Sequence, residues 1–102
     1  MIKVLFKAPH GKFEEREINN TLEDMQKLVD GYIEVISTDI DDKVFMIVNE
    51  EGKLYGLEPN LYYYSDIIVG NIVFVKVDNK GNWKSISDKQ IEAIKKYFGN
   101  YY

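Results

Sequence analysis

The chain has 102 residues, of which 45% are hydrophobic and 29% are charged, and its formal net charge is -4 at pH 7. This length and composition are typical of one globular domain, which we expect to span residues 1–102. The negative charge disfavours direct DNA binding, and the absence of cysteine excludes disulfides and thiolate catalysis and suits a cytoplasmic protein.

The first third of the chain predicts two strands and a helix. Residues 2–7 alternate in a way that is typical of a half-buried strand. Residues 13–18 include three glutamates and an arginine, which predicts a partly exposed strand at a sheet edge, where charge deters edge-to-edge pairing. Residues 22–29 have apolar side chains at helical spacing after a cap at Asn20 or Thr21, and a glycine soon afterwards predicts the helix end.

The middle of the chain predicts a β-meander on which the other elements pack. Residues 32–37 and 44–49 each alternate with period two and are rich in β-branched side chains. Residues 39–42, between them, have the length of a hairpin connection. A turn at residues 49–52 then leads to a predicted short strand at residues 53–55.

The last part of the chain predicts a loop, two strands and a second helix. Residues 56–66 are the least regular segment and form the longest candidate loop. Residues 67–77 predict a strand that a glycine and an asparagine interrupt, and residues 83–86 predict a short strand after a hairpin loop. Ser87 and Gln90 have the spacing of a capping box and begin a helix with an apolar stripe.

Together these elements predict the fold class. They follow in the order β-β-α-β-β-β-β-β-α, which indicates an α+β domain with a mainly antiparallel, curved sheet of five to seven strands and two helices. No apolar run approaches the roughly 20 residues that cross a bilayer, so we expect no membrane partner. Exposed strand edges also leave room for a homo-oligomer that pairs across a two-fold axis.

No constellation of side chains points to catalysis or to a cofactor. Asp39, Asp41 and Glu50 match the first, third and twelfth positions of an EF-hand loop, but a lysine and a valine occupy the fifth and sixth. His10 is the only histidine, so no histidine cluster can bind a metal. Nucleophile elbows, phosphate-binding glycine loops and dinucleotide fingerprints are absent from the sequence. We therefore expect no metal, no cofactor, no catalytic residues and no enzyme activity.

The most distinctive local feature is a run of three tyrosines that follows Asn60 and Leu61. Three consecutive tyrosines cannot all face one core, so at least one ring should be exposed. Three interpretations remain open: the rings pack under a loop, contact another protein, or stack on a nucleotide. Arg16, the only arginine, suits bidentate recognition of carboxylate or phosphate, unless it balances the glutamates around it. The candidate binding residues are Tyr55, Asn60, Tyr62, Tyr63, Tyr64 and Arg16.

The segment NEEGKLYGLEPN, at residues 49–60, gives the chain a resemblance to a known family. It is similar to a domain-of-unknown-function family of small proteins from phages, plasmids and mobile elements of Gram-positive bacteria, which carries an NEEGKLxGLxPN motif. The similarity extends to the segments MIKV, EEREI, TLEDMQKLVDGYIEV and IVG, and to the start of the last helix. Family members often have a basic or small segment after the PN pair, where this chain has Leu61 and the tyrosines.

The resemblance implies no enzyme activity and a context among the accessory genes of mobile elements. Small proteins of that context often bind and disable a host factor. We therefore expect a non-enzymatic binding protein that inhibits or redirects a host bacterial protein, such as an anti-phage defence component. Two alternatives remain open: a sponge that sequesters a small nucleotide signal, and an acidic mimic of nucleic acid.

Overall fold

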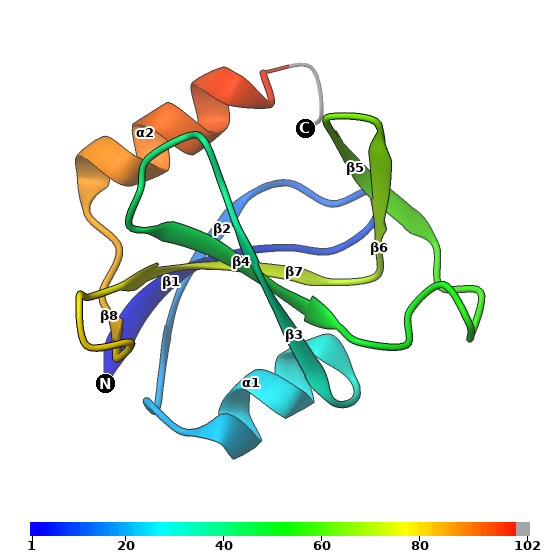
Figure 1. Ribbon diagram of the computed structural model, residues 1–102, viewed down its shortest axis with the longest axis horizontal. Coiled ribbons are helices and arrows are strands. Elements are labelled where there is room, and N and C mark those ends of the chain that lie inside the picture. Colours follow the sequence, from blue (N-terminus) through cyan, green and yellow to red (C-terminus); the bar gives the residue numbers. More distant parts are fainter. Residues whose placement is uncertain (100–102) are drawn as a thin grey trace.

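The computed structural model describes residues 1–99 and shows a twisted sheet between two helices (Figure 1). None of the helices in this described part of the chain is long and apolar enough to cross a membrane. In chain order the elements are β1 Ile2–Lys7, β2 Glu14–Ile18, α1 Leu22–Val29, β3 Ile33–Ser37, β4 Val44–Asn49, β5 Pro59–Tyr63, β6 Asp66–Val69, β7 Ile72–Val77, β8 Trp83–Lys84 and α2 Asp88–Tyr97.

The strands form two antiparallel sheets. In the larger sheet β2, β1, β7, β4 and β3 lie side by side in this order, and β8 also pairs with β7. A separate two-stranded sheet contains β5 and β6. This arrangement, with two helices, confirms the predicted α+β class and its mainly antiparallel sheet. β2 lies at one edge, as its high density of charge predicts.

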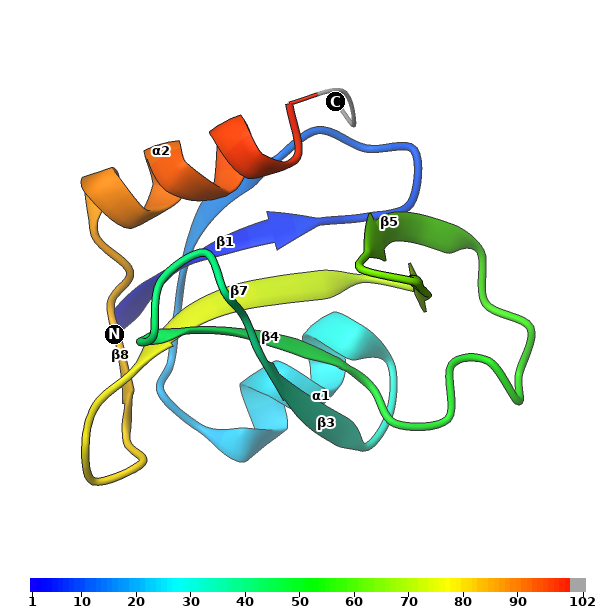
Figure 2. The same ribbon diagram turned by 45° about the horizontal axis from the view of Figure 1, so that its top comes forward.

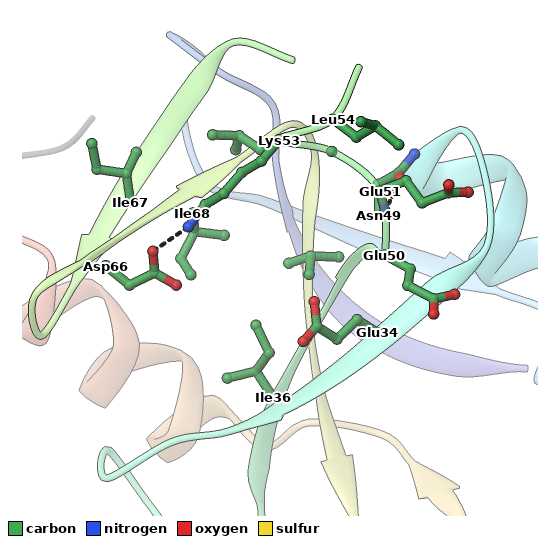
Figure 3. Close-up of a pocket in the computed structure, with 13 residues that line it drawn as sticks. Glu34, Ile36, Asn49, Glu50, Glu51, Lys53, Leu54, Asp66, Ile67 and Ile68 are labelled. Carbon is green, nitrogen blue, oxygen red and sulfur yellow. Dashed lines mark hydrogen bonds and ion pairs between the residues drawn. The ribbon is translucent and has the colours of Figure 1, made fainter. Parts of the chain in front are cut away.

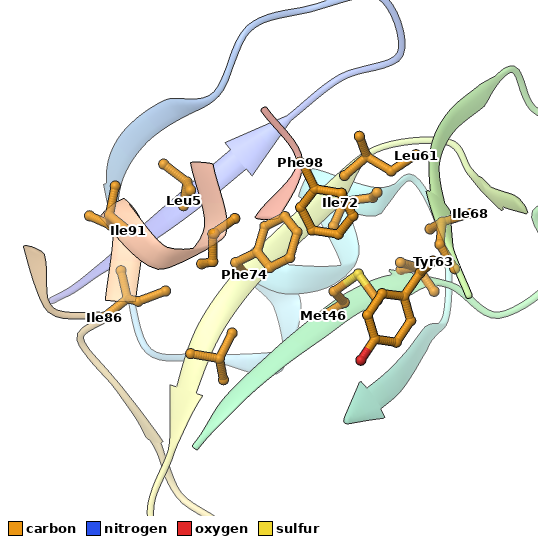
Figure 4. Packing of buried hydrophobic residues seen from close by; sticks show 13 residues of the cluster. Leu5, Met46, Leu61, Tyr63, Ile68, Ile72, Phe74, Ile86, Ile91 and Phe98 are labelled. Carbon is orange, nitrogen blue, oxygen red and sulfur yellow. The ribbon is translucent and has the colours of Figure 1, made fainter. Parts of the chain in front are cut away.

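Each face of the larger sheet carries a hydrophobic cluster. α1 covers one face, where Met25 is fully buried, and α2 covers the other (Figures 1 and 2). The β5–β6 hairpin extends the cover on the α2 side. Leu61 and Tyr63 of the hairpin and Ile94 of α2 belong to the same cluster, part of which Figure 4 shows. The hairpin is therefore attached to the domain through its own buried side chains.

Both helices begin at side-chain caps. The Thr21 hydroxyl accepts a hydrogen bond from the backbone N–H of Asp24 at 3.2 Å. Ser87 and Gln90 exchange side-chain-to-backbone bonds of 3.1 and 2.9 Å in a capping box. Each cap satisfies N–H groups that the first helical turn leaves without partners. The predicted caps are confirmed, with Thr21 as the cap of α1.

The centre of the sheet differs from the prediction. The predicted β3–β4 hairpin forms, but β3 lies at the edge of the sheet, and β7 occupies the middle, between β1 and β4. The first four residues of β7, from Ile72 to Val75, are all buried because both faces of this strand are covered. The expectation that the meander of residues 31–57 forms the platform is therefore wrong. An apolar run without alternation marks the central strand.

The segment between β4 and β7 also differs from the prediction. Residues 53–55 lie in a turn rather than a strand, and the expected loop at residues 56–66 contains β5 and the start of β6. The first two tyrosines of the run lie in the extended strand β5, because the alternate side chains Leu61 and Tyr63 reach the α2-side cluster. Tyr64 lies in the turn that follows. The expected strand at residues 67–77 is divided between the two sheets, because the chain turns at a glycine with a φ of 75°.

Two asparagine side chains, one at the end of β4 and one just before β7, hold the C-terminal end of α1. Asn49 donates from Nδ2 to the backbone oxygens of Val29 at 3.1 Å and Asp30 at 3.3 Å. Asn71 donates to the backbone oxygen of Leu28 at 2.9 Å. Carbonyl groups at the end of a helix have no partner within the helix, and these bonds satisfy them. They attach α1 to the end of β4 and the start of β7.

We expect Asn49→Ala to lower the free energy of unfolding by about 2 kcal/mol, because it leaves backbone oxygens at a largely buried junction without donors. Urea denaturation followed by circular dichroism measures this change. Asn79→Ala removes an exposed amide from a hairpin loop and is the matched control, with an expected change below about 0.5 kcal/mol. Equal losses of unfolding free energy in the two variants would contradict the role of Asn49 in holding α1.

Candidate functional site

The β5–β6 hairpin presents its tyrosines on alternate sides. Tyr63 is 8% exposed, whereas Tyr62 and Tyr64 are 55% and 69% exposed. The Tyr63 ring lies 5.9 Å from the ring of Tyr97, and its hydroxyl accepts a hydrogen bond from the backbone N–H of Asp39 at 2.6 Å. Tyr63 thus anchors the hairpin to α2 and to the β3–β4 loop, and the two rings beside it face outward.

Tyr64 has an unfavourable backbone conformation. Its φ is 55°, in the left-handed region, where a bulky side chain is disfavoured and glycine or asparagine is preferred. Its ring packs edge-on against the Tyr63 ring at 4.8 Å between centroids. The turn therefore keeps a large aromatic ring exposed at a position where the backbone alone would favour a smaller residue.

Asn60 joins the hairpin to β1. Its Nδ2 donates to the backbone oxygens of Lys7 and Gly70, each at 2.8 Å, and its Oδ1 accepts from Lys7 Nζ at 2.7 Å. Lys7 is 2% exposed, and this burial lowers the pKa of its ammonium group. Among residues 1–99 no carboxylate forms an ion pair with Lys7. The polar atoms of Asn60 thus fix the hairpin and are used within the fold.

The structure places the other two candidate residues apart from the hairpin tip. Tyr55 is exposed in the turn between β4 and β5. Arg16 lies on the edge strand β2, with its guanidinium carbon 3.9 Å from the centre of the Phe6 ring and one nitrogen 3.2 Å from Glu14. Phe6 belongs to the α1-side cluster, on the face opposite the hairpin. Arg16 is therefore not part of the surface on which Tyr62 and Tyr64 are exposed.

A groove of about 410 Å³ lies between β3, β6 and the turn that follows β4 (Figure 3). We call it the β3–β6 groove. Ile36, Val48 and Ile68 are apolar residues of its lining. The remaining lining residues are Glu34, Asn49, Glu50, Glu51, Gly52, Lys53, Leu54, Asp66, Ile67 and Val69.

Negative charge dominates the β3–β6 groove. Its lining includes four carboxylates and one ammonium group, the side chain of Lys53. Lys53 forms an ion pair with Asp66 across the groove, and this contact holds the pKa of Asp66 below its usual value (Figure 3). Three glutamates, Glu34, Glu50 and Glu51, remain without a cationic partner among residues 1–99. The groove therefore suits a cationic ligand better than an anionic one.

A second hollow of about 410 Å³ lies on the other side of the same turn. Tyr32 and Tyr55 line it, together with residues from the end of α1. Asn49 and Glu51 line both hollows, and Asn49 Oδ1 accepts a hydrogen bond from the backbone N–H of Glu51 at 2.8 Å. The asparagine that holds α1 therefore also fixes the turn between the two hollows.

Several exposed apolar side chains line these hollows or lie on the elements that form them. Ten large hydrophobic residues of the described chain are exposed, and seven of them lie on or next to β3, on this turn, or on the hairpin. The seven are Tyr32, Val35, Leu54, Tyr55, Tyr62, Tyr64 and Ile67. Tyr62 and Ile67 are directly opposite each other in the β5–β6 ladder. Leu54 and Ile67 line the β3–β6 groove, and Tyr32 and Tyr55 line the second hollow, as expected for a binding surface.

The sequence interpretation missed the groove. Its walls come from β3 and β6, which lie far apart in the chain, and no spacing rule brings Glu34 close to Ile67. Two local signals were present. Glu34 is a single charge in an otherwise uncharged strand, and Leu54 and Tyr55 are large apolar residues in a turn, where polar residues are usual.

Residues 1–99 contain no group of three histidine, cysteine, aspartate or glutamate side chains placed to bind a metal ion. Asp41, from the acidic loop, instead accepts hydrogen bonds from the backbone N–H of Lys43 at 2.8 Å and the Gln90 amide at 3.4 Å. These bonds, the first above all, lower its pKa. His10 lies 3.4 Å from Glu58 on the surface.

A family model described as Domain of unknown function (DUF3846) matches residues 2–99. This match agrees with the resemblance to a domain-of-unknown-function family that the NEEGKLYGLEPN segment suggests. Neither the curated proteins nor the solved structures contain a match to the chain.

Lys7→Met should change stability in a pH-dependent way. Because the pKa of Lys7 is lowered in the folded chain, the unfolded chain binds its proton more readily, and the charged lysine opposes folding at neutral pH. This penalty disappears as the pH rises toward the unfolded value of 10.5. The parent should therefore gain stability relative to Lys7→Met over that range.

Urea denaturation at a series of pH values measures the difference between the two proteins, and tyrosine ionisation, common to both, largely cancels. Lys89→Met, on the exposed face of α2, is the control and should show a nearly constant difference from the parent. If the difference in unfolding free energy between the parent and Lys7→Met is also independent of pH, the lowered pKa of Lys7 is contradicted.

Proposed function

The chain belongs to the DUF3846 family, and we propose that it is a non-enzymatic binding protein that acts by occupying a surface of another protein. The observation that carries this proposal is the exposure of Tyr62 and Tyr64 on either side of the anchored ring of Tyr63. Tyrosine offers a large contact area and a polar hydroxyl at low rotamer-entropy cost. Rigid support of the kind that Tyr63 gives lowers the entropic cost of binding further.

The conformation of Tyr64 supports the same proposal. A left-handed tyrosine is less stable than a left-handed glycine or asparagine by about 1–2 kcal/mol. Strained residues of this kind cluster at functional sites, where the side chain has a use that outweighs the local cost. A ring kept exposed at such a position is better explained by contact with a partner than by stability of the domain.

The partner that we propose is a bacterial host protein, for example an anti-phage defence component, which the domain inhibits or redirects. The sequence resemblance supports an origin in a phage or mobile element, and the absence of cysteine supports the bacterial cytoplasm as location. Occupancy of a partner surface is a mode of action that requires no catalytic group in the domain.

The charges of the candidate surface favour a protein over a nucleotide signal. A nucleotide pocket needs cations or backbone N–H groups around its phosphates, whereas the β3–β6 groove is lined by four carboxylates. Arg16 lies on the opposite face, and Lys7 donates to Asn60 inside the fold. The nucleic-acid mimic is less favoured, because the surface is rich in exposed apolar rings as well as in carboxylates.

Tyr62→Ala and Tyr64→Asn should each weaken partner binding by about 2 kcal/mol, or roughly 30-fold, as expected for central aromatic residues of an interface. Both variants should stay folded. Tyr64→Asn replaces a strained residue by one that tolerates the left-handed region, and we expect its stability to lie within about 1 kcal/mol of the parent.

Native mass spectrometry of the tagged protein purified from bacterial cells identifies the bound polypeptide, and titration of the purified partner measures affinity. Leu22→Ala, an exposed apolar residue of α1, is the control and should leave affinity unchanged. Full affinity in both tyrosine variants would overturn the proposal. A retained adduct of nucleotide mass, with no polypeptide, would overturn it in favour of the sponge.

A further inference from the structure

The edge strand β3 has an unpaired side. Tyr32 accepts a backbone hydrogen bond from Glu50 at 2.8 Å, and the β3–β4 register then continues with Glu34 opposite Val48. In an antiparallel ladder every second residue bonds to its neighbour, and the residues between direct their N–H and C=O groups to the other side. The backbone groups of Ile33, Val35 and Ser37 therefore point away from β4, and among residues 1–99 they form no hydrogen bond with other residues.

The two edges of the large sheet differ in their protection. β2 carries four charged residues, and the Arg16 guanidinium covers the Phe6 ring beside it. β3 carries one charge, Glu34, and its central residue Val35 is 47% exposed. Proteins protect free edges with charge, proline or a covering segment, because an open edge is a template for another strand. β3 lacks the dense charge that protects β2.

The β3–β6 groove lies directly beside this open edge. Glu34 and Ile36 of β3 face the groove, on the same side of the sheet as Val48 of β4. A strand added beside β3 would direct every second side chain toward that side. There these side chains would meet the carboxylates of Glu34, Glu50 and Glu51 at the rim and the apolar side chain of Ile36 (Figure 3).

We propose that the β3 edge binds an extended, basic segment of the partner protein as an additional β-strand, with its lysine or arginine side chains in the β3–β6 groove. Main-chain hydrogen bonds to Ile33, Val35 and Ser37 hold the segment, as in other cases of strand addition, and the acidic groove selects its charge. This inference rests on the proposed function and specifies how one part of the partner is recognised.

The charge of the groove favours such a segment over a second copy of the chain. Two β3 strands that pair across a two-fold axis would bring both copies of Glu34 to the same face, beside the glutamates of both grooves. Like charges at that distance oppose association. The chain as a whole is also acidic, with a net charge of -4.

The probe is the synthetic peptide acetyl-Lys-Val-Arg-Val-Lys-Val-Arg-amide, which alternates basic and β-branched residues. Titration into the whole protein, followed by NMR, gives the affinity, and amide hydrogen exchange gives the mode of binding. We expect saturable binding with slower exchange at Ile33, Val35 and Ser37. Glu34 and Ile36, whose amides already face β4, should change little. The same peptide with glutamate in place of lysine and arginine should not bind.

Val35→Pro removes the central N–H of the open side and breaks no bond to β4, since proline is tolerated on the free side of an edge strand. Val35→Thr keeps the N–H group and a β-branched side chain and is the matched control. We expect Val35→Pro to weaken peptide binding by about tenfold or more and Val35→Thr to leave it within about twofold. Thermal melting of both variants verifies that the sheet remains intact.

Three results would overturn the inference. The first is the absence of binding by the basic peptide at millimolar concentration. The second is equal peptide affinity in Val35→Pro and Val35→Thr, which would show attraction by charge alone. The third is slow exchange at Val35 in the free protein together with a dimer in light scattering, which would assign the edge to a second copy.

Tyr62→Ala and Tyr64→Asn leave β3 unchanged and should bind the peptide like the parent. Failure of the strand-addition inference is therefore visible in the Val35 variants with the peptide. Failure of the proposed function is visible in the tyrosine variants with the purified partner.

Discussion

The β3–β6 groove and the second hollow both depend on the hydrogen bonds of the Asn49 side-chain amide. This amide closes the C-terminus of α1 through two backbone oxygens and accepts the N–H of Glu51, so it connects the helix, β4 and the following turn. A Cβ atom on Gly31 would lie 2.7 Å from the nitrogen of this amide, so a larger residue there would have to displace the Asn49 side chain. Because Asn49 lines both hollows, their shape is coupled to the packing of α1. A ligand in either hollow would therefore contact residues that the packing of α1 holds in place.

The hairpin that carries the tyrosines is held by a second polar contact and by one aromatic ring. Asn60 bonds to Lys7 and Gly70, and Tyr63 enters the α2-side cluster. A buried lysine that has only an amide and a carbonyl as partners opposes stability, so the contact is better explained by the position that it gives the hairpin. Exposed rings on a rigid support and an open strand edge lie within one region of a small domain. Together they give that region two different means of contact, side-chain packing and main-chain hydrogen bonding.

Sequence patterns over a few residues correctly predicted the helix caps and the charged edge strand. The capping residues Thr21 and Ser87 and the charged edge strand β2 follow from short-range patterns, and the structure agrees. The position of β7 depends on partners that are distant in the sequence, and its run of buried residues carries no alternation that would reveal them. For the same reason Asn60 was interpreted as a binding residue, although its bonds are internal. The exposure of some tyrosines was predictable from their number, whereas the groove arises only when β3 and β6 come together.

The central place of β7 also has a consequence for synthesis on the ribosome. β1 and β2 can form one hairpin and β3 and β4 another as soon as they emerge, but β1 and β4 are not neighbours. The two hairpins become one sheet only when β7, which ends at Val77, inserts between them. Until then each hairpin has a free edge and an uncovered apolar face, and isolated two-stranded units are marginal in water. The sheet therefore stays incomplete until β7 has left the tunnel, and it then closes by a long-range pairing that is intrinsically slow.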